Sequence, residues 1–242
     1  MRTYADHAKG GDAPGTVVLE RADGRSGELV LRRHGADLEV IAGGTFLISS
    51  ANAASSEALV TAGLRHLAPA AAPSGGLEVL IGGLGLGYAL DAALAEQRVE
   101  RVTVAEYEPI VVDWFRAYGA GRAARLTAGE AAGRARVVVA DVADVMRESP
   151  GSFDLVALDT DNGPDWLVRA ANAGLYDDAG LQSTRRSLRL GGVAAFWSPE
   201  RYAWFAARLT AVFEQLREEQ AHDHVGGRRH EYTMYVARRG VD

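Results

Sequence analysis

The sequence predicts an α/β protein with a doubly wound, mostly parallel seven-strand sheet and a small N-terminal β-hairpin segment. Short apolar runs in the later part of the chain alternate with helix-like segments, which is the pattern of strands joined by crossover helices. Earlier runs are separated by Gly and Asp turns with no helix between them, which is typical of hairpins. A Pro- and Gly-containing stretch divides the two patterns and predicts a linker. We therefore divide the chain into a β segment with a helix (1–68), a linker (69–76) and a Rossmann-like domain (77–242).

The first segment begins with a polar end, residues 1–15, which carries no apolar pattern. Branched apolar residues then cluster between turn signals over residues 16–49, and two or three hairpins fit this stretch best. Residues 51–68 carry leucines at helical spacing, so we expect a helix there.

The second region contains apolar runs, each of which ends at a turn or a polar residue. Strands are predicted at 77–83, 99–107, 135–141, 153–159, 192–198 and 231–239. Among the helices between them, we expect one at 175–190, ended by Gly191 and Gly192 as a C-cap, and a long amphipathic one at 201–220.

Composition excludes several kinds of chemistry. The chain has no cysteine, so disulfides, thiolate metal sites and cysteine nucleophiles are absent. Its one lysine, Lys9, lies in the unpatterned N-terminal end, which excludes P-loop and Schiff-base chemistry. A net charge of −6 argues against a nucleic-acid partner, and the lone His222/His224 pair is too little for a metal site. No secretory signal and no apolar run long enough for a membrane are visible, so we expect a cytoplasmic protein.

A glycine-rich loop follows the strand at 77–83. Gly83, Gly85 and Gly87 give the spacing G-x-G-x-G, which occurs in enzymes that use S-adenosylmethionine (SAM). The dinucleotide fingerprint G-x-G-x-x-G would need glycine where Tyr88 stands, which disfavours an NAD enzyme. The same glycines also suit a turn that merely packs a helix on a strand.

Carboxylates end the next three predicted strands. Glu106 lies 19 residues after Gly87, where an acid can accept both hydroxyls of a ribose. Asp141 ends the third strand and can accept from an adenine amino group, although strand-end aspartates also serve as helix caps. Asp159 ends the fourth strand and should face the same crevice, because ligands of open α/β sheets bind at the carboxyl ends of strands.

Asp159 also opens a polar patch that continues with Asp161 and Asn162. A strand-end carboxylate can bind an ammonium group and then receive its proton, which an alkyl acceptor must lose before it attacks. We therefore assign Asp159 as the catalytic base, with Asp161 assisting and Asn162 contacting the substrate. Turn chemistry around the following Gly-Pro is the other interpretation of Asp161 and Asn162.

Together, VLIGGLGLG, VTVAEYEP, Asp141, FDLVALDTDNGP and the N-terminal β segment resemble the spermidine/spermine synthase family, on the class I SAM-methyltransferase fold. The resemblance implies an aminopropyltransferase that uses decarboxylated SAM, and a homodimer assembled through the N-terminal β region. The family's glycine motif carries an Asp that recognises the donor amine, and Gly85 stands at that place here. The family's second catalytic Asp is replaced by Asn162 or displaced to Asp161.

Gly85 makes intact SAM the expected donor, because loop N–H groups could hold its carboxylate while an Asp would repel it. We therefore expect transfer of a methyl or other alkyl group from SAM to a small amine or amino-acid-like acceptor. Aminopropyl transfer from decarboxylated SAM to a polyamine is the alternative, and a non-catalytic nucleoside-binding protein is a third possibility. Trp197, Arg229 and His230 are candidates for acceptor contacts, although Trp197 also suits the core and the two basic residues suit a solvated turn.

Overall fold

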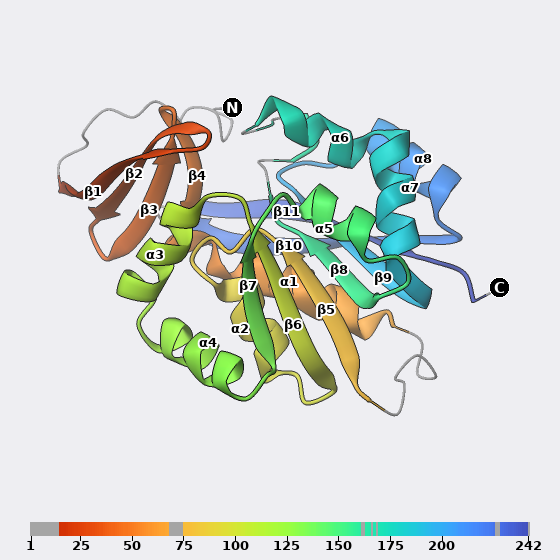
Figure 1. Cartoon of the computed structure of the whole chain (residues 1–242). Coiled ribbons are helices and arrows are strands. Elements are labelled where there is room, and N and C mark those ends of the chain that lie inside the picture. Colours follow the sequence, from red (N-terminus) through yellow and green to blue (C-terminus); the bar gives the residue numbers. More distant parts are fainter. Residues whose placement is uncertain are drawn as a thin grey trace.

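Two β-sheets organise the chain in the computed structural model, which describes residues 15–67, 75–160, 163–165, 167, 169–225 and 228–241 (Figure 1). The smaller sheet is an antiparallel meander in chain order, and its strands are β1 (Thr16–Gly24), β2 (Gly27–His34), β3 (Asp37–Ala42) and β4 (Thr45–Ser49). The predicted N-terminal hairpins are therefore confirmed, as three successive ones.

The larger sheet has seven strands in the order β10-β11-β9-β8-β5-β6-β7. Their bounds are β5 (Leu77–Gly82), β6 (Val99–Glu106), β7 (Ala135–Val139), β8 (Phe153–Leu158), β9 (Leu188–Ser198), β10 (Gln215–Val225) and β11 (Arg228–Arg238). Strands β5 to β9 pair in parallel, whereas β11 runs antiparallel to both β9 and β10. The predicted mostly parallel, seven-strand sheet is confirmed.

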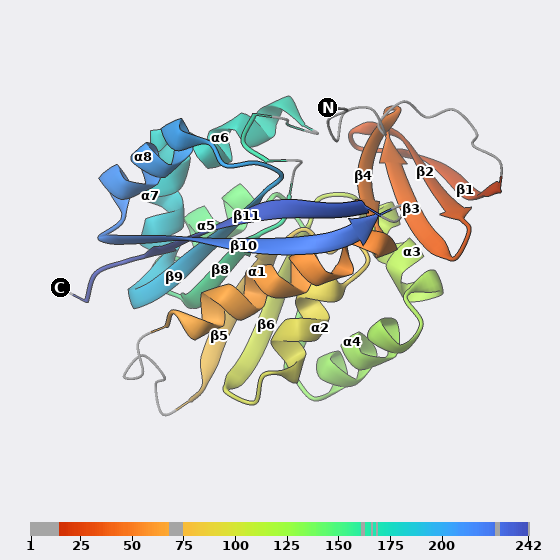
Figure 2. The ribbon, with the colours of Figure 1, turned by 180° about the vertical axis from the view of Figure 1, so that it is seen from behind.

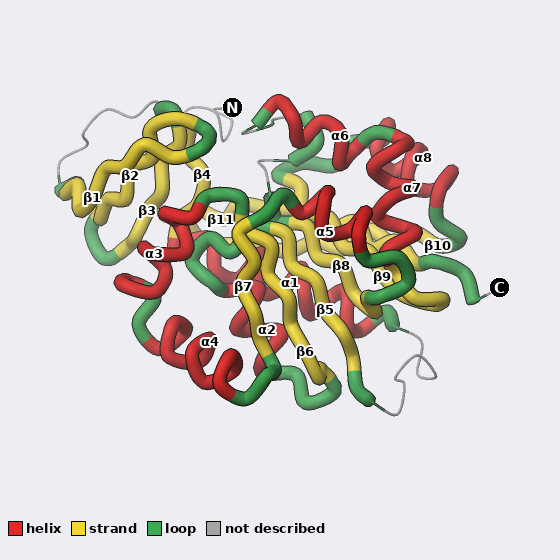
Figure 3. Tube along the Cα trace, in the orientation of Figure 1, coloured by secondary structure: helices red, strands yellow, loops and turns green. Residues whose placement is uncertain are grey.

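Helices cover both faces of this sheet (Figures 2 and 3). They are α1 (Ala53–Arg65), α2 (Tyr88–Ala95), α3 (Pro109–Tyr118), α4 (Gly121–Ala131), α5 (Val142–Glu148), α6 (Ala173–Tyr176), α7 (Asp178–Ser187) and α8 (Ala203–Val212), with short 3-10 turns at Ser50–Asn52 and Ala170–Asn172. Leu59 of α1 and Leu90 of α2 belong to one apolar cluster, and Met146 of α5 and Leu209 of α8 belong to the other. Among the described helices, none combines the length and apolarity that a membrane span requires.

Strand β5 shows why an apolar run becomes the centre of such a sheet. Successive side chains of a strand point to opposite faces, so a strand covered on both sides has to be apolar throughout. Val79 and Ile81 pack into the cluster with α1 and α2, and Leu80 packs into the opposite cluster. All three side chains are fully buried.

The end of the chain differs from the sequence prediction. The prediction of a helix at 201–220 is wrong beyond the end of α8. The chain enters β10 at Gln215 and pairs residue by residue with β11. Residues 215–220 favour a helix locally, but the unpaired edge of β11 offers a full ladder of hydrogen bonds. Likewise, the helix expected to run to residue 190 ends at Ser187, and Gly191 and Gly192 lie within β9.

The small sheet is attached to the large one through α3 and the β6–α3 junction. Trp114 of α3 is buried among Leu29 and Leu31 of β2. Its Nε1 donates to Glu20 of β1 at 2.8 Å, and the Tyr118 hydroxyl donates to the same carboxylate at 2.7 Å. Helix α1, by contrast, packs on the large sheet, with its leucines in the same cluster as β5.

Glu108 holds the β1–β2 turn against the β6–α3 junction of the large sheet. Its carboxylate is 5% exposed and accepts the backbone N–H groups of Arg25 and Ser26, each at 2.7 Å. We expect Glu108→Ala to lower the free energy of unfolding by about 2 kcal/mol, because two hydrogen bonds to a charged group are lost. Urea denaturation followed by tryptophan fluorescence measures this.

The matched control is Glu231→Ala, which removes an exposed carboxylate paired with Arg229 on β11. Exposed ion pairs contribute little, so the free energy of unfolding should change by less than about 0.5 kcal/mol. Equal losses in the two variants would contradict the role given to Glu108.

Candidate active site

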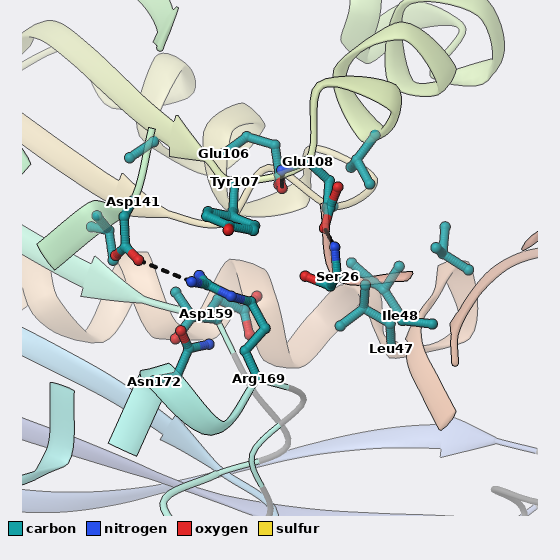
Figure 4. Close-up of a pocket in the computed structure, with 18 of the residues that line it drawn as sticks. Ser26, Leu47, Ile48, Glu106, Tyr107, Glu108, Asp141, Asp159, Arg169 and Asn172 are labelled. Carbon is teal, nitrogen blue, oxygen red and sulfur yellow. Dashed lines mark hydrogen bonds and ion pairs between the residues drawn. The ribbon is translucent and has the colours of Figure 1, made fainter. Parts of the chain in front are cut away.

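A crevice lies between the carboxyl ends of β5, β6, β7 and β8 and the inner face of the small sheet (Figure 4). The strand ends of the large sheet and the loops that follow them line it with the carboxylates of Glu106, Asp141 and Asp159, next to Gly83. The small sheet supplies an apolar wall made of Leu29, Val40, Ala42, Leu47 and Ile48. The crevice therefore has carboxylates on the side of the large sheet and apolar side chains on the side of the small sheet.

The glycine loop between β5 and α2 approaches its neighbours too closely for side chains. Gly83 has φ +91°, and a Cβ there would lie 2.6 Å from the backbone oxygen of Asp159. Gly85 has φ +49°, and a Cβ would collide with Ile48 of β4. Gly87 also has positive φ and closes on Phe115. The loop is thus the contact point between the strand that carries Asp159 and the apolar wall.

Four of the loop's N–H groups are engaged within the protein. Gly83 donates to the Ala105 oxygen at 2.9 Å, and Gly87 donates to the Leu84 oxygen at 2.8 Å. Leu84 donates to Glu106 Oε2 at 2.9 Å, and the N–H of Gly85 also bonds to the Glu106 carboxylate. Because these four amides already have partners, the structure does not support the expectation that they would hold a donor carboxylate.

Glu106 is placed where the sequence predicted a ribose-binding acid. It ends β6 and is 8% exposed, and its Oε1 accepts from the N–H of Glu108 at 2.8 Å. Burial raises the pKa of Glu106, while the backbone hydrogen bonds act in the opposite direction. Each carboxylate oxygen has two lone pairs, so Glu106 can organise the loop and still accept a hydroxyl.

Asp141 both caps a helix and faces the crevice. Its Oδ1 accepts from the N–H of Ala143 in the first turn of α5 at 3.0 Å. Its Oδ2 accepts from Arg169 at 3.2 Å, and the Arg169 guanidinium lies 3.4 Å over the ring of Tyr107 (Figure 4). Arg169 is thus the one cation among the described residues that line this crevice, and it was not predicted because it lies eleven residues beyond the end of β8 with no motif around it.

Asp159 follows β8 and lines the crevice beside the glycine loop. The Ser56 hydroxyl in the first turn of α1 donates to its Oδ2 at 2.8 Å. Burial raises the pKa of Asp159, the Ser56 hydrogen bond lowers it, and the charge of Asp223 raises it further. A carboxylate with a raised pKa is a stronger base, and this property suits a proton acceptor.

Of the remaining predicted site residues that the structure describes, one lines the crevice and two do not. Trp197 lines the crevice, is 7% exposed and packs against Tyr232 with ring centroids 5.0 Å apart. Arg229 is exposed and pairs with Glu231, and His230 is half-buried; neither is among the residues that line the crevice. Asp161 and Asn162 lie outside the described residues.

A smaller recess opens from the crevice between the glycine loop and α1. It is lined by Ile48, Ser56, Gly83, Leu84, Gly85, Gly87, Tyr88, Ala89 and Asp159. Asp159 is the one charged side chain among these lining residues. Arg122 stacks 4.0 Å over the Tyr88 ring and donates to the Leu86 oxygen, and it is not part of the lining. Within the described ranges, no three His, Asp or Glu side chains form a group suited to a metal.

Comparisons with known proteins agree with this architecture. No protein-family model matches the sequence, and a search of curated proteins gives no match. Among solved structures, a spermidine synthase in complex with the transition state analogue AdoDATO has a TM-score of 0.74 and 19% identity over 93% of this chain and 74% of the other. The spermidine synthase from Thermotoga maritima has a TM-score of 0.72 and 18% identity over 93% of this chain and 73% of the other. The chain therefore has a spermidine synthase-like fold, as its motifs predicted.

Proposed function

We propose that the chain is an aminopropyltransferase, which moves the aminopropyl group of decarboxylated SAM to a small amine. The likeness to spermidine synthases, one of them solved with a transition state analogue, supports the reaction class. The observation that carries the choice of donor is the recess beside the glycine loop, where Asp159 is the one charged group among the lining residues that the structure describes.

The order of the strands suggests how a donor would lie. Glu106 on β6 would accept one ribose hydroxyl, and Asp141 beyond β7 would accept from the adenine amino group, in competition with Arg169. From there the crevice leads across β5 and past Gly83 to Asp159 on β8. The sulfonium and the transferred chain would then lie beside the recess.

The charge of the recess discriminates between the two donors. Decarboxylated SAM brings a sulfonium and an ammonium, and both are attracted by the Asp159 carboxylate. Intact SAM brings a carboxylate as well, which the recess would meet with a like charge and with loop amides that are already bonded. We therefore propose decarboxylated SAM as the donor, where Gly85 alone had predicted intact SAM. The directions of the loop N–H groups affect the choice of donor more than the residue at position 85 does.

Asp159 would also accept the proton of the acceptor amine. The ammonium of the acceptor loses its proton to the Asp159 carboxylate, and the nitrogen lone pair then attacks the carbon beside the sulfonium. The C–N bond forms as the C–S bond breaks, and the sulfur leaves with the electron pair as a neutral thioether. Raising the basicity of Asp159 by burial helps the first of these steps.

Calorimetry with decarboxylated SAM, SAM and NAD tests the donor. We expect decarboxylated SAM to bind at least about tenfold more tightly than SAM, because a like charge is avoided in a partly buried site, and we expect no binding of NAD. Equal affinity for the two sulfonium donors would overturn the donor assignment. Mass spectrometry of reactions with short diamines then tests transfer, and tight donor binding without product would favour the nucleoside-binding alternative.

A further inference from the structure

The N-terminus of α1 lies between two buried carboxylates that are far apart in the sequence. Asp223 of β10 is 4% exposed and accepts the N–H of Ala54 at 2.9 Å and the N–H of Ser55 at 3.2 Å. These are groups that a helix start cannot satisfy within the helix. Asp223 therefore anchors the beginning of α1 to the far edge of the large sheet.

The next residue along α1 makes the contact with the active site. Ser56 is 8% exposed, and its hydroxyl donates to Asp159 Oδ2 at 2.8 Å. Three consecutive residues, 54 to 56, thus connect the Asp223 carboxylate to the Asp159 carboxylate. A shift of this helical turn would move the hydroxyl that orients Asp159.

The two carboxylates also interact through their charges. The charge of Asp223 raises the pKa of Asp159, and the Ser56 hydrogen bond lowers it, with burial as the largest influence. His230 of β11 lies opposite Asp223 in the strand register, and His222 is exposed on β10. Glu106, Asp141 and Arg169 face the same crevice from β6, α5 and the segment before α6.

We propose that Asp223 is a positioning residue of this active site, which fixes the first turn of α1 so that Ser56 holds the Asp159 carboxylate toward the crevice. Its negative charge makes Asp159 a stronger base at the same time. The catalytic meaning of this inference rests on the proposed transferase function, whereas the coupling between the two carboxylates does not.

The coupling is measured directly by ¹³C NMR titration of the Asp159 side-chain carboxyl, assigned by its loss in Asp159→Asn. Asp223→Asn keeps one of the two oxygens that accept from α1 and removes the charge, so the Asp159 midpoint should fall by about half a pH unit or more. Ser56→Ala removes the hydrogen bond that favours the charged form, so the midpoint should rise by a similar amount, again about half a unit.

Asp154→Asn is the matched control. Asp154 is 1% exposed, lies at the opposite end of β8 and accepts from the N–H of Glu78 and from Arg189. Its replacement also removes a buried carboxylate and should leave the Asp159 midpoint unchanged. An unchanged midpoint in Asp223→Asn, or a shift of the same size in Asp154→Asn, would overturn the inference.

Activity separates this inference from the proposed function. If the chain transfers aminopropyl groups, the acidic limb of the kcat profile should move to lower pH in Asp223→Asn and to higher pH in Ser56→Ala. A kcat profile that stays in place while the NMR midpoint moves would remove the positioning role. If no donor is turned over, the proposed function fails and the NMR shifts still decide the coupling. If Asp223→Asn does not fold, the test rests on Ser56→Ala. An Asp159 midpoint that fails to rise in that variant would then overturn the inference.

Discussion

Asp159→Asn is expected to lower kcat for aminopropyl transfer by about 10²- to 10⁴-fold, the range for loss of a general base. The amide keeps the shape of the side chain and can still accept from Ser56, so the loss comes from the missing proton acceptor. The preference for decarboxylated SAM over SAM should disappear in the same variant, because the charge of the recess is removed. Steady-state kinetics with a diamine acceptor and calorimetry with both donors check the two effects.

The same substitution should stabilise the protein at neutral pH. Because burial raises the folded-state pKa of Asp159, folding favours the protonated carboxyl, and this contribution is lost as pH rises through the folded-state pKa. Asn carries no such dependence. The variant should therefore have no advantage in the free energy of unfolding when the pH is below 3.8, the ordinary aspartate pKa. Its advantage should grow as the pH rises toward neutrality. Full activity in the variant, or a stability advantage independent of pH, would contradict this account.

Much of the fold follows from local pattern. The apolar runs of β5, β6, β8 and β9 are buried on both faces of the sheet. A short, continuously apolar run is typical of such a strand, and the sequence predicted a strand at each of the four. Strand β10 was not predicted because its residues 215–220 are mostly polar and favour a helix, and its pairing with β11 is a tertiary interaction. Local preference was overridden by a partner that only the folded chain provides.

The site divides in the same way. The shared location of Glu106, Asp141 and Asp159 in one crevice was predictable because the carboxyl ends of parallel strands meet at one edge of a sheet. Ser56 and Asp223 were not, since their contacts with Asp159 and α1 join residues 103 and 168 or 169 positions apart. The loop amides were misjudged because glycine spacing indicates a tight turn but does not tell which way each N–H points.

Gly83→Ala is expected to weaken donor binding by about 10- to 100-fold, because its Cβ would lie 2.6 Å from the Asp159 backbone oxygen and something must shift. A backbone oxygen cannot rotate away as a flexible side chain can, so the shift moves either the loop or Asp159. Glu106 would be disturbed as well, since it bonds to the N–H of Leu84 in this loop. Calorimetry with decarboxylated SAM measures the loss.

Gly133→Ala separates the collision from backbone strain. Gly133 has φ +70°, similar to the +91° of Gly83, but a Cβ there would have no neighbour within 4 Å. Both variants should lose about 1 to 2 kcal/mol of unfolding free energy from an alanine held at positive φ, which thermal or urea denaturation measures. Donor affinity should fall in Gly83→Ala alone, because Gly133 follows α4 and is not among the residues that line the crevice. Equal donor affinity in the two variants would mean that the glycine loop does not form the donor site, and the role assigned to Asp159 beside it would fail with it.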